Sequence, residues 1–174
     1  MAKIIYKKGM EGQNKLSCIE GIEIDLLNGQ KALIYPYYAE RQMLKPEQIE
    51  KWNAKNETEI EALKRTSTSF ETECLRDIDS PAALWVSQFH YAKYSNFALP
   101  SLLAALEIQH QKTEIDALTE TIDGADFLGD FTSLTWSCSR AGSSDGWIVR
   151  GSYGYTRGID LYGVYLVVPT ILYR

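Results

Sequence analysis

The segment 21–35 constrains the fold of this chain more than any other local pattern. Apolar residues alternate with polar ones in its first half, at Ile22, Ile24 and Leu26. Asn28-Gly29 follows, and a second apolar run covers 32–35. Alternation at every second residue is typical of a strand with one buried face, and Asn-Gly between two such runs favours a type I′ turn. The segment therefore predicts a β-hairpin, and residues 3–6 can add an edge strand.

Three amphipathic segments in the middle of the chain predict helices. The first segment spans 45–68, begins with Pro46 and fits one or two helices, with Glu and Lys or Arg four residues apart in the favourable order. The second spans 79–89, and the third begins at Ser101, whose hydroxyl can cap it, and extends towards Leu118.

Beyond Gly124 the pattern changes to short apolar runs separated by Gly and Ser. These runs predict strands over 134–138, 147–150, 152–155 and 165–173. Helices followed by an antiparallel sheet indicate an α+β fold. We divide the chain into an N-terminal hairpin and helical extension, residues 1–78, and a second domain, residues 79–174.

Size and charge exclude several classes of protein. A chain of 174 residues with 45% apolar and 24% charged residues can bury a core as one domain with a small appendage. The net charge of −5 lacks the basic footprint that nucleic-acid binding needs. No apolar run is long enough for a signal peptide or a membrane span, so we expect synthesis and folding in the cytoplasm. Three widely spaced cysteines fit reduced thiols, not a disulfide framework.

The segment from Trp136 to Tyr165 has the composition of a recognition surface. It holds six of the twelve Gly and four of the eleven Tyr, with five Ser, three Arg, no Lys and no Glu. Tyr and Arg supply stiff contact area, and Ser and Gly supply adaptable hydrogen bonds, as in antibody paratopes. The same residues also fill turns and exposed faces of ordinary antiparallel sheets, so composition alone leaves both readings open.

Short motifs stand in a fixed order in the second half of the chain, over roughly 79–174. They are Phe97-Ala98-Leu99-Pro100-Ser101-Leu102, Ile115-Asp116-Ala117-Leu118, Thr135-Trp136-Ser137-Cys138-Ser139, Gly146-Trp147-Ile148-Val149 and Val167-Val168-Pro169 with Arg174. Through these motifs the chain resembles a bacterial C-type-lectin-like domain family of collagen-like adhesins and phage or prophage proteins. This resemblance implies a C-type-lectin-like fold of two helices and a small twisted antiparallel sheet. Cys138, where the family more often has Ser, and Leu134-Thr135, where an aromatic is common, are departures on the scale of packing.

The resemblance also implies a function for the segment 139–165. This segment is similar to the variable region of proteins diversified by retroelements, many of which are phage receptor-binding proteins. We therefore expect a non-enzymatic protein, synthesised without a signal peptide and associated with virions, that binds a protein or glycan on a host cell surface. A homo-oligomer or a phage particle is the expected further partner. The expected ligand-binding residues are Arg140, Ser143, Asp145, Arg150, Tyr153, Tyr155, Arg157, Asp160 and Tyr162.

We expect part of this set to form one exposed face. Tyr153 and Tyr155 point the same way in an extended strand, and the glycines around them let the stretch from Arg157 to Tyr162 turn back beside them. A solvated strand edge is the competing interpretation for the arginines. Core packing is the stronger interpretation for the tryptophans. The predicted core anchors are Trp136, Trp147, Leu99, Leu102, Leu106 and Val168.

Two alternatives come from other functional classes. An enzyme related to the formylglycine-generating oxidases, or a hydrolase, could use the same scaffold, since Val149-Arg150-Gly151-Ser152-Tyr153 faintly resembles a strand of these oxidases. The oxidase chemistry needs two neighbouring cysteines. Cys138 is the only cysteine after Cys74 in this chain. His90 and His110 have no evident triad partner. The other alternative is a structural subunit that buries the recognition surface in an oligomer. We expect no cofactor, no catalytic residue and no metal, because Asp145 and Asp160 alone cannot supply the six or more oxygens that calcium takes.

Overall fold

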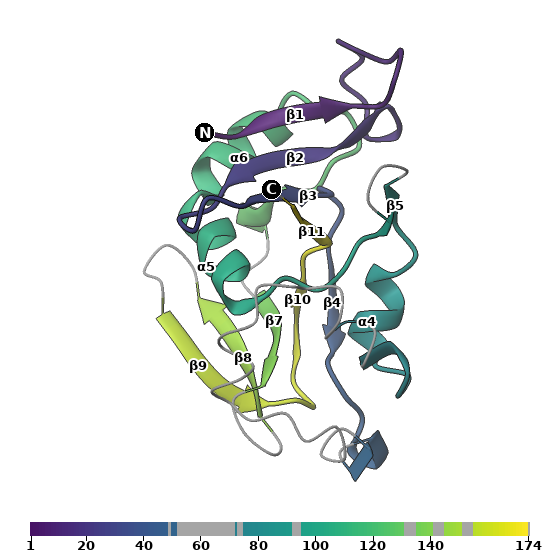
Figure 1. The fold of residues 1–174 in the computed structure, drawn as a ribbon, viewed down its shortest axis with the longest axis vertical. Helices are drawn as coiled ribbons and strands as arrows, with labels where there is room; N and C mark the ends of the chain where they lie inside the picture. The colour runs from purple at the N-terminus through teal and green to yellow at the C-terminus, as the bar shows by residue number, and fades with distance from the viewer. Residues whose placement is uncertain are drawn as a thin grey trace.

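The computed structural model describes most of the chain, in two larger sheets with helices packed beside them (Figure 1). The described residues are 1–48, 50–51, 72, 75–91, 95–130, 135–140, 145–150 and 155–173. The predicted helix over 45–68 lies mostly outside them, and its described start is a 3₁₀ turn, η2 (Pro46–Gln48). No described helix is long and apolar enough to cross a membrane.

The first sheet joins the two ends of the chain. Its four strands pair antiparallel in the order β1-β2-β3-β11, with bounds β1 (Lys3–Tyr6), β2 (Ile19–Asp25), β3 (Lys31–Ile34) and β11 (Thr170–Tyr173). A 3₁₀ turn, η1 (Leu16–Cys18), leads into β2. The predicted hairpin and edge strand are thereby confirmed.

The turn of this hairpin is not type I′, which corrects the prediction. Among the described residues Asn28 does not have a positive φ, whereas Gly29 does, at 78°. The amide of Gly29 donates to Leu26 O at 3.0 Å, and the amide of Leu26 donates to Gln30 O at 2.9 Å. This pattern is a longer loop with one left-handed glycine, and that conformation is open to Gly because it has no Cβ.

The second sheet contains two of the strands predicted in the C-terminal half, those over 134–138 and 147–150. One of its outer strands covers 155–160 and was not predicted, and the predicted strand over 152–155 lies outside the described residues except for Tyr155. The order of the sheet is β4-β10-β7-β8-β9, with bounds β4 (Ala39–Gln42), β10 (Val164–Val167), β7 (Thr135–Arg140), β8 (Asp145–Arg150) and β9 (Tyr155–Asp160). All neighbours are antiparallel except β10 and β7, which are parallel. A small separate hairpin pairs β5 (His90–Tyr91) with β6 (Ser95–Asn96).

The apolar run over 165–173, predicted as one strand, divides between the two sheets. β10 belongs to the second sheet and β11 to the first, and Val168-Pro169 separates them. The partner strands β3 and β4 divide in the same way, since β3 pairs with β11 and β4 with β10. The amide of Tyr35 donates to Pro169 O at 3.1 Å between the two ladders. Pro cannot donate to a ladder, so it fits at the break.

Two helices begin where the sequence places a capping serine. Ser80 caps α4 (Pro81–Val86) and Ser101 caps α5 (Leu102–His110), each through a hydroxyl that accepts an amide at 3.2 Å. α4 ends before Phe89, sooner than predicted. The third predicted helix ends at His110, and α6 (Lys112–Thr119) follows it as a separate helix after Gln111.

The buried apolar residues form two clusters, and each cluster contains residues of both larger sheets. One gathers around Trp136, Ile148 and α4, and the other around Leu166, Ile24 and the two helices α5 and α6. Trp136, Leu99 and Val168 are fully buried, as predicted. Leu102 and Leu106 are only half-buried, because α5 turns its alanines and Ile108 inward instead. The side chain of Trp147 lies outside the described part.

The fold is α+β, as predicted. Both sheets contain strands from each side of residue 78, so the hairpin packs into the same body as the second half. The boundary at 78/79 stays a prediction.

Candidate functional site

The predicted ligand-binding positions gather on three neighbouring strands, β7, β8 and β9. The ladder places Arg150 directly opposite Tyr155 and Asp145 directly opposite Asp160. Arg157 lies opposite Ile148, and Arg140 lies opposite Gly146 on the other side of β8. Directly opposed residues in an antiparallel pair are only about 5 Å apart. Six of the nine positions are thus neighbours, and their backbone alone is described; Ser143 and Tyr153 lie outside the described residues.

Tyr162, the ninth position, occupies the turn between β9 and β10. Its carbonyl accepts the Nε2 amide of Gln42 at 2.8 Å, which ties the turn to β4. The neighbouring Leu161 is buried, and its carbonyl accepts the amide of Leu44 at 3.1 Å. Tyr162 itself is half-buried.

The strand β9 corrects the geometry expected for this face. The chain does not turn back at Arg157, because β9 continues to Asp160 with six consecutive pairs to β8. The turn comes only after Asp160. Glycine at 158 did not bend the strand, since six main-chain pairs hold it straight against β8.

Buried side chains pack against both faces of the inner strand β7. The indole of Trp136 on β7 has no exposed surface, and its Nε1 donates to Arg41 O at 2.9 Å. The ring of Tyr165 meets it edge to face at 5.0 Å. On the other face of β7, Gln109 of α5 donates to Thr135 Oγ1 at 2.6 Å. β7 is therefore held on both faces. Arg140 lies at its end, and five of the other predicted positions lie beyond it on β8 and β9.

Glycine at position 163 sets the place of Tyr165. A Cβ built on Gly163 would lie 2.3 Å from Cε2 of that ring. A side chain at this position would therefore require the ring of Tyr165 to shift. This contact links the β9–β10 turn to Trp136.

The residues raised for an enzyme do not come together in the described structure. Cys138 is a buried cysteine on β7, and its amide donates to Pro100 O at 2.8 Å. His90 and His110 are both exposed, on β5 and at the end of α5. Among the described residues, no three His, Cys, Asp or Glu side chains form a group suited to a metal ion. Cys74 lies outside the described part.

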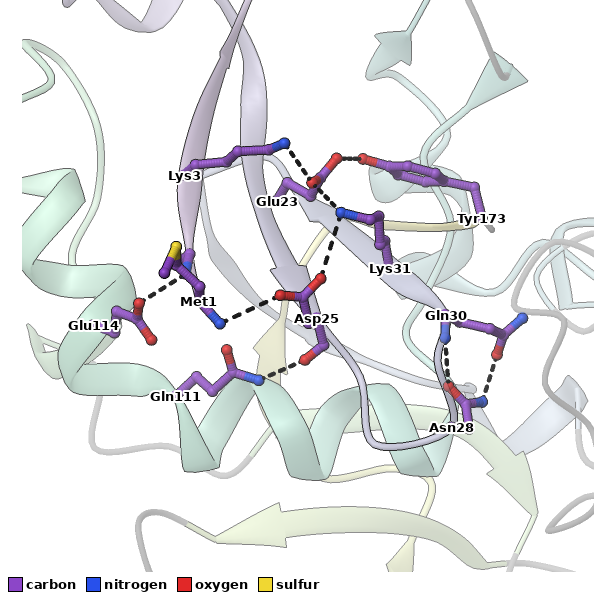
Figure 2. Close-up of polar contacts among 11 residues, drawn as sticks. Met1, Lys3, Glu23, Asp25, Asn28, Gln30, Lys31, Gln111, Glu114 and Tyr173 are labelled. Atoms are coloured by element: carbon purple, nitrogen blue, oxygen red, sulfur yellow. Dashed lines mark hydrogen bonds and ion pairs between the residues drawn. The ribbon is translucent and has the colours of Figure 1, made fainter.

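The sequence did not single out the main charged cluster, which lies on the first sheet (Figure 2). Glu23 of β2 accepts from Lys31 of β3 at 2.7 Å, from Lys3 of β1 at 3.0 Å and from the hydroxyl of Tyr173 of β11. Burial raises the pKa of Glu23, but the hydrogen bonds from Lys31, Tyr173 and Lys3 together lower it more, to about 2 from 4.5. The carboxylate therefore joins all four strands.

An aromatic cluster at α4 was also missed. Tyr37 stacks on Trp85 with ring centroids 6.3 Å apart, Phe89 meets Trp85 edge to face at 5.0 Å, and the guanidinium of Arg41 lies 5.6 Å from the Trp85 ring centre. Tyr37 remains 44% exposed. This cluster lies beside β4, at the opposite edge of the second sheet from β9 (Figure 1).

The chain matches no protein-family model, no curated protein and no solved structure.

Proposed function

We propose that this chain is a non-enzymatic binding protein that recognises its ligand through β8, β9 and the flanking turns. The observation that carries the proposal is the register of the second sheet. Positions chosen from sequence for their recognition chemistry are direct neighbours in that register, with Arg150 opposite Tyr155 and Asp145 opposite Asp160. Tyr and Arg on adjacent strands supply the rigid contact area that binding surfaces favour.

The arrangement of the core supports the same proposal. Trp136 and Val149 are buried on β7 and β8, so packing residues occupy the inner strands. β9 is the outermost strand of the sheet. Main-chain pairing holds it to β8 at six consecutive positions, and such pairing does not depend on which side chains the strand carries. A binding surface at this edge can change its side chains without disturbing the core.

The finer identity is part of the proposal. The motifs between Phe97 and Pro169 resemble those of the C-type-lectin-like family of phage, prophage and adhesin proteins, and the segment 139–165 resembles a retroelement-diversified region. On that basis we propose a receptor-binding protein associated with virions, whose ligand lies on a host cell surface.

The test compares two matched double variants. Tyr155→Ser with Arg157→Ser alters the proposed surface, and Tyr37→Ser with Arg41→Ser removes the same residue types at the opposite edge of the sheet. Binding is measured on glycan arrays, protein arrays and whole bacterial cells. Loss of a central Tyr and Arg should weaken binding about 30-fold or more in the first variant and leave the second within about threefold of the parent.

The outcome is read together with thermal melting. Equal binding by the first variant and the parent would refute the proposed surface. A first variant that unfolds would identify these side chains as core. Preferential loss in the second variant would move the binding site to the aromatic cluster at α4.

A further inference from the structure

Four strands form the outer edges of the two larger sheets, and three of them carry features that block further pairing. An edge strand presents unpaired amides and carbonyls to any extended chain, and proteins protect such edges with lysines, bulges, short strands or covering elements. β1 carries Lys3 and has a register shift between Ile5 and Tyr6. β11 is bridged at Thr170 by Ala98, with amide to carbonyl distances of 2.9 and 2.8 Å.

The strand β4 is also protected. It has only four residues, its central Glu40 and Arg41 are exposed and charged, and α4 packs beside it. Three of the four edge strands are thus protected from further pairing, by a lysine and a bulge, by a bridging residue, or by charged residues and a covering helix.

The fourth edge, β9, carries two charged residues, Arg157 and Asp160, but it shows no lysine, no register shift and no bridging residue among the described residues. It is six residues long and pairs with β8 at every position from Asp145↔Asp160 to Arg150↔Tyr155 without a register shift. Its sequence, Tyr-Thr-Arg-Gly-Ile-Asp, contains no Lys and no Pro. An antiparallel ladder uses the main-chain groups of alternate residues on one side, so those of the other three residues of β9 face away from β8.

We propose that the ligand is a polypeptide, and that an extended segment of it adds to β9 as a sixth strand of the sheet. This inference rests on the proposed function and names the class of its ligand. Strand addition takes its affinity from main-chain hydrogen bonds and its specificity from side chains that alternate along the strand. The tyrosine, arginine and aspartate positions of β8 and β9 then select which segment binds.

A second copy of the chain can add to this edge only in a restricted set of registers. A twofold axis requires registers in which the two residue numbers add up to an even number. The register centred on Arg157 places like charges directly opposite each other, which is unfavourable. The register centred on Gly158 places Arg157 opposite Ile159, with no charge pair gained. A foreign segment is free of this symmetry restriction.

The first measurement is amide hydrogen exchange of β9 by NMR in the free, full-length protein. Three alternate amides should exchange within the dead time and the other three should be protected by β8. Protection of all six amides would show that the edge is already covered and would overturn the proposal.

The second measurement uses a probe, a phage-displayed library of random twelve-residue peptides selected on the full-length protein. A selected peptide should protect the three outward amides. N-methylation of two alternate amides of the peptide should weaken its binding about tenfold, whereas methylation of the intervening amides should change it less than about threefold. Strand addition would be overturned if methylation of every peptide amide weakened binding equally. It would also be overturned if the selected peptides left the amide exchange of β9 unchanged.

A variant of the protein completes the test. Proline replaces whichever of Thr156 and Ile159 has the unprotected amide, so that the pairing to β8 is retained and no proposed ligand-binding side chain is removed. Peptide binding should fall about tenfold or more with little change in melting temperature. If the proline variant unfolds, the peptide methylation series still decides. A glycan ligand that depends on Tyr155 and Arg157 but leaves the β9 amides exchanging would refute this inference and leave the proposed function intact.

Discussion

Replacing Trp136 tests whether the inner strand of the candidate site is core or a ligand platform. The indole is fully buried, donates to Arg41 O at 2.9 Å and meets Tyr165 edge to face. Trp136→Ala removes that buried area, leaves a cavity and orphans the carbonyl. Truncation of a buried aromatic costs about 3–5 kcal/mol, and the lost hydrogen bond accounts for roughly 1 kcal/mol of this. We therefore expect the free energy of unfolding to fall by about 4 kcal/mol.

Two further variants separate these contributions. Trp136→Phe keeps a ring but loses the Nε1 donor, and we expect a loss of about 2 kcal/mol. Trp85→Ala is the matched control, because Trp85 is only half-buried and its partners Tyr37 and Arg41 are themselves exposed. We expect about 1–2 kcal/mol there. The assay is urea unfolding followed by circular dichroism, with m-values compared to detect changes in the unfolded state. A loss below about 1 kcal/mol for Trp136→Ala would place the indole at the surface and revive the ligand-platform interpretation.

Three other predictions concern the body that carries the site. Gly21→Ala should cost about 2–3 kcal/mol in urea unfolding, because its Cβ would lie 2.5 Å from Ile34 O, and a loss near zero would mean that β2 and β3 are further apart. Glu23→Gln should cost about 1–2 kcal/mol at pH 7. The folded pKa of Glu23 is depressed to about 2, so this contribution is present above about pH 4.5 and is lost as pH falls towards 2; an unfolding difference that stays constant from pH 7 to pH 2.5 would contradict it. Ser80→Ala should cost about 2 kcal/mol and Ser101→Ala about 1 kcal/mol in thermal melts, because the Ser80 hydroxyl both caps α4 and donates to a buried carbonyl at 2.6 Å; equal losses would mean that the second bond contributes nothing.

Local sequence patterns predicted the individual strands and helices better than the places where one element ends and the next begins. The alternation of apolar and polar residues at Ile22 and Ile24 predicted the hairpin, because this pattern depends only on residues close together in the sequence. The apolar run 165–173 was predicted as one strand, because periodicity cannot show that the chain leaves one sheet and enters another. Pro169 was the only residue that indicated a break between two strands. The inward face of α5 was misjudged because small residues allow the helix to approach the strands closely, so Ala104 and Ala105 are buried in place of the larger leucines.

Contacts between distant residues could not be predicted in this way. Glu23 meets Tyr173 across 150 positions of the chain, and Trp136 donates to Arg41 across 95. Neither pair has a spacing that a helix or a strand would repeat. The candidate site was within reach because its positions lie on consecutive strands, where β8 follows β7 and β9 follows β8. The stretch that was expected to turn back at Arg157 continues as β9, and the turn follows Asp160.

The position of β9 explains how a binding surface can share a small body with a tightly packed core. Buried residues such as Trp136 and Ile148 lie on β7 and β8, and the ladder that holds β9 is made of main-chain groups. Substitutions on the outer strand away from caps and strained backbone usually change stability by less than about 0.5 kcal/mol. Tyr155→Ser with Arg157→Ser should therefore melt within about 2 °C of the parent, whereas Trp136→Ala should melt far lower. A large loss of stability in the β9 variant would show that its side chains are part of the core, and the separation between packing and recognition would then fail.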